Sequence, residues 1–100
     1  MGKKFDAGLK KRKKVLGENY VNSSFENAND FNKPFQEFLT ETYWGGVWDR
    51  NGIDDKTKSI VTLSVLIALR AEHEIAIHTK GALNNGVTPE ELMAILIHSS

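Results

Sequence analysis

Glu74 and His78 are the residues whose types and spacing are best suited to chemistry. Side chains four positions apart share one face of an α-helix, so the carboxylate of Glu74 can reach the imidazole of His78. A carboxylate that accepts the imidazole N–H stabilises the imidazolium, which predicts a raised pKa for His78 and a role as proton donor. The same spacing is also typical of a surface ion pair, and periodicity does not settle which face is buried.

A sharp corner between two helices follows this pair. Asn84-Asn85-Gly86 predicts the end of the first helix, because glycine accepts the left-handed backbone of a C-terminal cap. Thr88 is the expected N-cap of the next helix, with Pro89 at its first position and Glu91 completing a capping box.

The two other histidines are weaker candidates. His98 ends the apolar run 93–97, a pattern typical of a core or interface histidine. His73 lies at an expected helix break and is predicted to be exposed. A spacing of five residues puts His73 and His78 about 140° apart on a helix, so they cannot readily chelate one ion, and no metal site is predicted.

Trp44, Trp48 and Arg50 form a second polar and aromatic cluster. Indole N–H groups and a guanidinium could hold a carboxylate substrate. The alternative is a hydrophobic plug that packs a loop against the rest of the protein.

Length and composition predict one small domain that oligomerisation would stabilise. The chain has 100 residues, 40% of them hydrophobic and 26% charged, and no cysteine, which excludes disulfides and thiolate catalysis. No apolar window is long enough for a membrane span, so a cytoplasmic protein is expected. The basic run at 10–14 lacks interleaved aromatic residues and precedes an acidic body, so no nucleic-acid partner is predicted. We expect a solvated helix face there, or a contact with another subunit.

Apolar periodicity predicts an all-α chain of about five helices. Between the first two helices, residues 21–29 are polar and predict a connector, and the glycine-rich stretch 43–52 predicts a shaped loop. The helix that Asp54 opens is apolar on nearly every side from 60 to 69, so it should be the buried central one. The expected helices are 3–18, one with Pro34 in its first turn, one from Asp54 to a break at 70–73, 73–85, and one from Pro89 to His98.

Several segments together resemble the carboxymuconolactone decarboxylase family. They are YWGGVWDR at 43–50, GID at 52–54, KTKSIVTL at 56–63, HTKGALNNGVT at 78–88 and EE at 90–91. The family also contains thiol peroxidases resembling alkylhydroperoxidase D, whose two cysteines would fall at Ala71 and Glu74 here. Neither is a cysteine, so the resemblance is to the decarboxylase branch.

The resemblance implies an all-helical fold, a homo-oligomer such as a hexamer or trimer, and a C-terminal helix continuing beyond His98. It implies cofactor-independent loss of CO2 from gamma-carboxymuconolactone, a small carboxylated lactone of protocatechuate catabolism, to give beta-ketoadipate enol-lactone. His78, oriented by Glu74, would donate the proton, and His98 would be a second donor or oxyanion partner. Trp44, Trp48 and Arg50 would contact the substrate. Two alternatives remain: a related lactone-processing or isomerising enzyme, and a non-catalytic helical oligomer.

Overall fold

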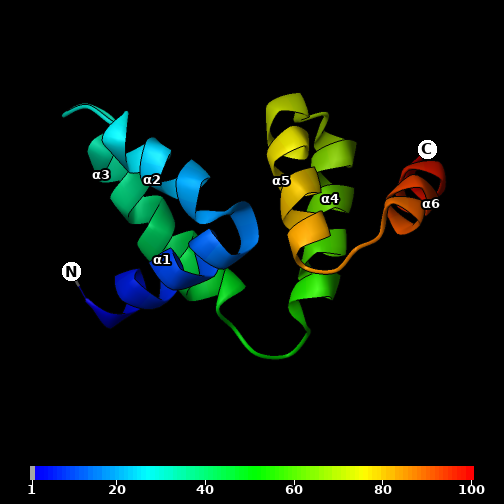
Figure 1. Ribbon diagram of the computed structural model, residues 1–100, viewed down its shortest axis with the longest axis horizontal. Helices are drawn as coiled ribbons and strands as arrows, with labels where there is room; N and C mark the ends of the chain where they lie inside the picture. Colours follow the sequence, from blue (N-terminus) through cyan, green and yellow to red (C-terminus); the bar gives the residue numbers. More distant parts are fainter. Residues whose placement is uncertain (1) are drawn as a thin grey trace. The chain divides into compact units, whose positions relative to one another are not determined.

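The computed structural model describes residues 2–100, and these are arranged as helices joined by short turns (Figure 1). The all-α prediction is confirmed. The helices form two compact units, residues Met1–Gly52 and Ile53–Ser100. Their bounds are α1 Lys3–Leu16, α2 Glu18–Glu26, α3 Lys33–Phe38, the π-helix η1 Leu39–Trp48, α4 Asp55–Leu69, α5 Glu72–Asn84 and α6 Pro89–Ser99.

In the first unit, α1 and η1 cross at two glycines. A Cβ atom added to Gly8 would collide with the carbonyl oxygen of Thr40 and would lie 2.6 Å from the backbone nitrogen of Gly45. A Cβ added to Gly45 would collide with the carbonyl oxygen of Lys4. The two backbones therefore meet at a distance that only glycine permits on both helices.

Arg12 joins the same two helices from the middle of the basic run. It is 3% exposed, and its Nη1 donates to Thr40 Oγ1 at 3.1 Å. The hydroxyl of Thr40 donates in turn to the carbonyl oxygen of Gln36 at 2.8 Å. The expectation of a solvated or intersubunit face is therefore wrong for Arg12, which belongs to the interior of this unit.

The predicted connector at 21–29 is wrong for most of its length, because α2 covers Glu18–Glu26. Gly17, with φ of 93°, ends α1 within the predicted range 3–18, and the chain turns directly into α2. Val21 of α2 is fully buried, and Phe25 one turn later packs edge-on against Phe5 of α1. These two apolar residues hold α2 against α1 although the remainder of the segment is polar.

The predicted loop at 43–52 is also wrong at its start. Residues up to Trp48 belong to η1, a π-helix that continues from α3 without a break. π-Helical turns are rare and are frequently found at functional sites. In this register, residues five apart become neighbours, which brings Tyr43 next to Trp48.

The second unit follows the local signals of the sequence closely. The Asp54 side chain caps α4 by accepting from the backbone N–H of Thr57 at 2.8 Å. Arg70, in the left-handed conformation with φ of 55°, ends α4 at the predicted break. Gly86, with φ of 94°, marks the corner after α5, and Thr88 and Glu91 form the predicted capping box of α6.

α4 is less buried than its composition predicts. α5 lies beside α4 (Figure 1), and α6 also packs against α4, but these helices cover only part of its surface. Val61, Val65 and Leu69 recur at four-residue intervals and are each more than half exposed. The prediction of a buried central helix is therefore wrong for this chain by itself, because one apolar face of α4 has no cover within its unit.

The core of the second unit is small. Leu63 of α4, Ala82 of α5 and Val87 of the corner are its buried members, with three partly buried residues around them. Next to it, the amide nitrogen of Asn85 donates to the hydroxyl of Ser59 at 2.9 Å, and Ser59 is only 1% exposed. This hydrogen bond ties the end of α5 to the first turns of α4.

Candidate functional site

His78 is buried on α5, with 6% of its surface exposed. It shares one face of the helix with Gly81 and Ala82, the other buried residues of α5. α5 packs against α4, and Ala82, one turn after His78, belongs to the core that Leu63 of α4 also forms. The apolar residues Ile75 and Ala76 lie between Glu74 and His78, so periodicity did not settle which face of the helix is buried. The structure shows that the imidazole of His78 is buried.

Burial lowers the pKa of His78 below its ordinary 6.5, because desolvation penalises the imidazolium. The negative charge of Glu74 acts in the opposite direction and offsets part of the shift. The sequence-based prediction of a raised pKa is therefore wrong for the free protein. Glu74 raises the pKa of His78 as expected, but desolvation of the ring lowers that pKa by more.

An apolar hollow of about 110 Å³ lies between the three helices of the second unit. Residues of α4, α5 and α6 line it, among them Leu63, Thr79 and Leu92. The hydroxyl of Thr79, the neighbour of His78 in sequence, donates to the carbonyl oxygen of Ile75 at 2.7 Å and so presents no free donor. The stripe of α5 next to His78 thus faces an apolar space.

The remaining candidates of the second unit lie at the surface. Glu74 is exposed one turn before His78, so the pair joins a solvated carboxylate to a buried imidazole. His98 is exposed in the last turn of α6, which does not agree with a core position in this chain. His73 is exposed, as predicted. Of these residues, the structure relates only Glu74 directly to His78.

Trp44, Trp48 and Arg50 belong to the first unit. The two indoles are stacked with centroids 5.2 Å apart and are 2% and 3% exposed. The indole N–H of Trp48 donates to the hydroxyl of Tyr43 at 3.1 Å, so the donor that we assigned to a substrate carboxylate has a partner within the chain. Arg50 is exposed just after η1. The packing of the indoles agrees with the hydrophobic plug that the sequence left as an alternative.

Two polar contacts were not anticipated from the sequence. The Tyr43 hydroxyl orients Trp48 through a spacing of five residues, which is meaningful only in a π-helix. The pair of Asn85 and Ser59 is far apart in sequence, and no local pattern marks it. Within residues 2–100 no group of three or more His, Asp or Glu side chains is placed to hold a metal ion. None of the helices described there has the length and apolar composition of a membrane crossing.

The lowered pKa of His78 predicts a titration midpoint below 6.5 in the folded protein. Replacing Glu74 by glutamine should lower the midpoint further, because the charge that favours the imidazolium is removed. Nuclear magnetic resonance of the ring proton adjacent to both nitrogens, assigned by loss of the signal in His78→Gln, measures both values. A midpoint above 6.5, or an upward shift in Glu74→Gln, would contradict this account.

The same shift has a consequence for stability. A folded-state pKa below the unfolded value means that the unfolded chain binds more protons in acid. The contribution of neutral His78 is therefore complete above about pH 6.5 and is lost as the pH falls through the folded-state pKa. Unfolding by urea at a series of pH values should show a smaller loss of stability on acidification in His78→Gln than in the wild type.

The fold and this site define a class: an all-α protein with a buried histidine next to a helix corner and no cysteine for thiol chemistry. Residues 33–100 match the carboxymuconolactone decarboxylase family. The chain is 46% identical to the 4-carboxymuconolactone decarboxylase of Acinetobacter baylyi over 97% of its own length and 72% of that protein. It is also 46% identical to the nitrosuccinic acid decarboxylase npaB of Metarhizium robertsii, over 96% of this chain and 67% of the relative. The chain belongs to the carboxymuconolactone decarboxylase family.

A third relative covers a shorter stretch. It is a 4-carboxymuconolactone decarboxylase of Pseudomonas putida, 46% identical over 37% of this chain and 77% of the relative. The identity to the first two relatives extends through nearly the whole chain, including the first thirty residues, which carry little of the family's motifs.

Proposed function

We propose that this chain catalyses the decarboxylation of 4-carboxymuconolactone, the gamma-carboxymuconolactone of the sequence analysis, to beta-ketoadipate enol-lactone. The observation that carries the proposal is the 46% identity, over nearly the whole chain, to a relative named for this substrate. The buried His78 supports it, because the reaction needs one proton delivered in a poorly hydrated place.

The substrate contains its own electron sink. A carboxylate sits on the ring carbon next to the ring oxygen, and its loss as CO2 drives electrons through the ring double bond to the lactone carbonyl. The resulting furan-like enolate is protonated at the ring carbon next to the lactone carbonyl to give the product. The protein must therefore bind two carboxylates, stabilise the enolate oxygen and donate one proton, and we expect no cofactor.

His78 is the proposed proton donor, and its lowered pKa bears on when the imidazole acquires the proton that it donates. In the free protein the imidazole is mostly neutral at pH 7. A dianionic substrate close to the ring would favour the imidazolium, since opposite charges within a few ångströms raise the pKa of a base. Substrate binding would then be accompanied by proton uptake, and the proton taken up would be the one delivered to carbon. Glu74 assists this step by its charge.

The other candidates keep their proposed roles with different support. Arg50 is exposed and carries the guanidinium best suited to a substrate carboxylate. Trp44 and Trp48 are buried, so they would act indirectly. Their packing would fix the C-terminal end of η1, which Arg50 follows. His98, exposed on α6, would reach a substrate only where another surface closes over it.

Nitrosuccinic acid is the second candidate substrate, because the relative named for it is equally similar. It also carries two carboxylates, and a nitro group on the carbon that loses CO2 can accept the electrons as a nitronate. Both reactions thus require the same two things from the protein. It must bind a dianion, and it must donate one proton to the carbanion that forms. We favour the lactone because two of the relatives carry its name.

The proposal is tested by supplying each compound to the purified chain and following its ultraviolet absorbance. We expect a kcat/KM for 4-carboxymuconolactone that exceeds the value for nitrosuccinate at least about tenfold, a difference of 1.4 kcal/mol in transition-state binding. The opposite ranking would make nitrosuccinate the substrate. No acceleration of either compound would refute the proposal and leave the two alternatives, a related lactone-processing or isomerising enzyme and a non-catalytic helical oligomer.

We further propose that the chain forms a homo-oligomer, a trimer or a hexamer. The support is the uncovered apolar stripe on α4, together with Met93, Leu96 and Ile97 on α6, each at least half exposed. Exposed apolar side chains gathered on two helices that are in contact typically mark an interface. We also propose that residues 1–100 form one family domain. A cytoplasmic location, as expected from the sequence, remains part of this proposal.

Replacing Val65 by glutamate should shift the protein to smaller species, because a charge would be buried without a partner at the centre of the stripe. Sedimentation velocity at several concentrations measures this shift. Lys80→Glu, on the exposed surface of α5, is the control and should leave the sedimentation coefficient unchanged. A wild-type chain that sediments as a monomer at all concentrations would refute the oligomer.

A further inference from the structure

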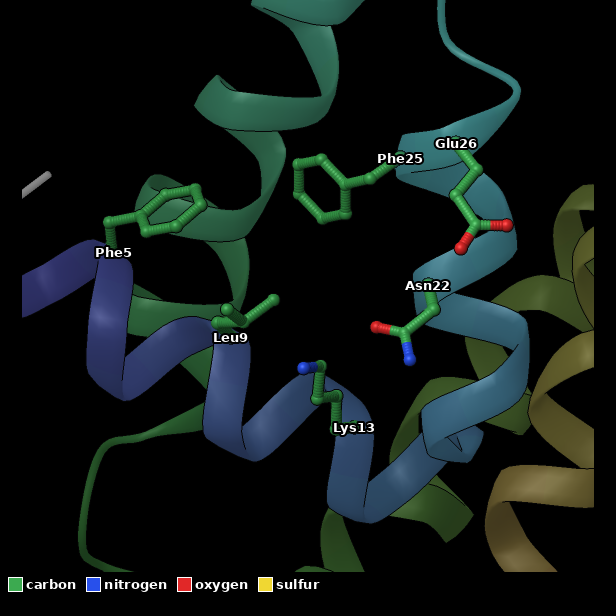
Figure 2. A pocket seen from close by; sticks show the side chains of 6 residues that line it. All are labelled: Phe5, Leu9, Lys13, Asn22, Phe25 and Glu26. Atoms are coloured by element: carbon green, nitrogen blue, oxygen red, sulfur yellow. The ribbon is translucent and has the colours of Figure 1, made fainter.

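A second hollow lies in the first unit, where nothing in the proposed decarboxylation uses it (Figure 2). It measures about 260 Å³ and lies between α1 and α2. Phe5, Leu9 and Lys13 line it from α1 at intervals of one helical turn. Asn22, Phe25 and Glu26 line it from α2.

One part of this hollow is aromatic, and its rings have partners within the unit. The rings of Phe5 and Phe25 meet edge to face at 6.2 Å with an interplanar angle of 76°. The guanidinium of Arg12 lies 5.7 Å from the centroid of Phe25, and Arg12 is itself buried and bonded to Thr40. Phe25 is thus held from two sides, and Leu9 completes an apolar wall before any ligand arrives.

The other part of the hollow is polar and carries both signs of charge. Lys13 supplies an ammonium from α1, while Glu26 supplies a carboxylate and Asn22 an amide from α2 (Figure 2). Among residues 2–100, no hydrogen bond or ion pair engages the side chain of any of these three. Lys13 and Glu26 line the same hollow without pairing with each other, so both charges are available to a third partner.

We propose that this hollow binds a small zwitterion with an aromatic side chain, the chemistry of an aromatic α-amino acid. The ring would pack against Phe5 and Phe25, the carboxylate would meet Lys13 and the amide of Asn22, and the ammonium would meet Glu26. The charges of the lining sum to zero, as do those of the ligand. An aromatic acid without the ammonium would leave Glu26 unpaired beside its carboxylate, and an aromatic amine would leave Lys13 unpaired.

The size of the hollow agrees with this class. Sites for drug-sized ligands measure roughly 300–1,000 Å³, so 260 Å³ fits a molecule with a single ring. An apolar wall with a few convergent polar groups is the usual composition of a small-molecule site. A long apolar side chain from another copy of the chain would fill the aromatic part but would leave both charges unused.

The test is a titration of the full chain with L-phenylalanine, followed by nuclear magnetic resonance of the Phe5 and Phe25 ring signals. Phenethylamine, which lacks the carboxylate, and 3-phenylpropanoate, which lacks the ammonium, are titrated in parallel. We expect phenylalanine to bind at least about tenfold more tightly than either analogue, the worth of one charge-assisted hydrogen bond. Equal affinities, or no shift of the ring signals at millimolar concentrations, would overturn the proposal.

Two variants assign the charges separately. Lys13→Met should remove the preference for phenylalanine over phenethylamine, and Glu26→Gln should remove its preference over 3-phenylpropanoate. Lys10→Met and Glu18→Gln are exposed controls on the same two helices and should keep both preferences. Circular dichroism confirms that each variant is folded. Loss of both preferences in a control, or of neither in the two variants, would contradict the assignment, as would ring shifts that depend on protein concentration and not on ligand.

Discussion

Replacing His78 by alanine is expected to lower kcat for 4-carboxymuconolactone at least about a hundredfold while the chain stays folded, the range for a positioned acid or base. The expectation follows from the burial of the ring, which keeps water from supplying the proton in its place. The charge of the imidazolium is proposed to favour binding of the dianionic substrate as well, so KM should rise somewhat in the variant. The loss in kcat should be the larger effect, because the proton is delivered only to the enolate that forms.

His73→Ala is the matched control, since His73 lies on the same helix and is exposed. It should retain activity within about twofold of the wild type. Urea unfolding of both variants separates lost chemistry from lost stability. Activity of His78→Ala within a few-fold of the wild type would remove His78 from the mechanism.

Replacing Gly45 by alanine is expected to destabilise the first unit by about 3 kcal/mol or more. The added Cβ would collide with the carbonyl oxygen of Lys4, and backbone on two packed helices cannot move aside as a flexible side chain can. For a unit of this size, with an unfolding entropy of about 2 cal/mol/K per residue, the loss corresponds to a melting temperature lower by roughly 25 °C or more. Differential scanning calorimetry provides the measurement.

Gly46→Ala is the control at the next residue. A Cβ there meets nothing within 4 Å, so the substitution should be neutral or should stabilise η1 by up to about 1 kcal/mol, since alanine loses less backbone entropy than glycine. If both variants melted at the wild-type temperature, the close crossing of α1 and η1 would be wrong.

Features with a local cause could be predicted from the sequence. The ends of α1 and α5 follow from Gly17 and Gly86, and the starts of α4 and α6 follow from the caps Asp54 and Thr88. Each of these residues acts on backbone groups within a few positions of itself, so its effect is independent of the tertiary fold. The family resemblance includes the segments with Asp54, Gly86 and Thr88, but it rests equally on YWGGVWDR at 43–50, whose π-helix was not predicted.

Features with a distant cause could not be predicted. α2 is polar and poor in strong helix formers, and the burial of Val21 and the packing of Phe25 on Phe5 of α1 stabilise it as a helix. The glycines of η1 indicated a loop. Gly45 is instead required by the close approach of the Lys4 backbone on α1, and the sequence around Gly45 does not show this contact. In both cases tertiary packing overrides local propensity.

The candidate site shows the same division. The spacing of Glu74 and His78 placed them on one helix face, and the structure keeps that relation. The direction of the pKa shift required the burial of His78, which no periodicity of α5 revealed. The contact between Tyr43 and Trp48 depended on a π-helical register that a spacing rule for α-helices does not contain.

The most direct test of the central claim uses 4-carboxymuconolactone labelled with ¹³C in the carboxylate on the ring carbon next to the ring oxygen. Decarboxylation predicts that labelled CO2 and bicarbonate appear in a one-to-one ratio with the lactone consumed, at a rate that depends on the chain. Hydrolysis or isomerisation of the lactone would instead retain the label in the organic product. Retention of the label there, with the substrate consumed, would contradict the decarboxylase account.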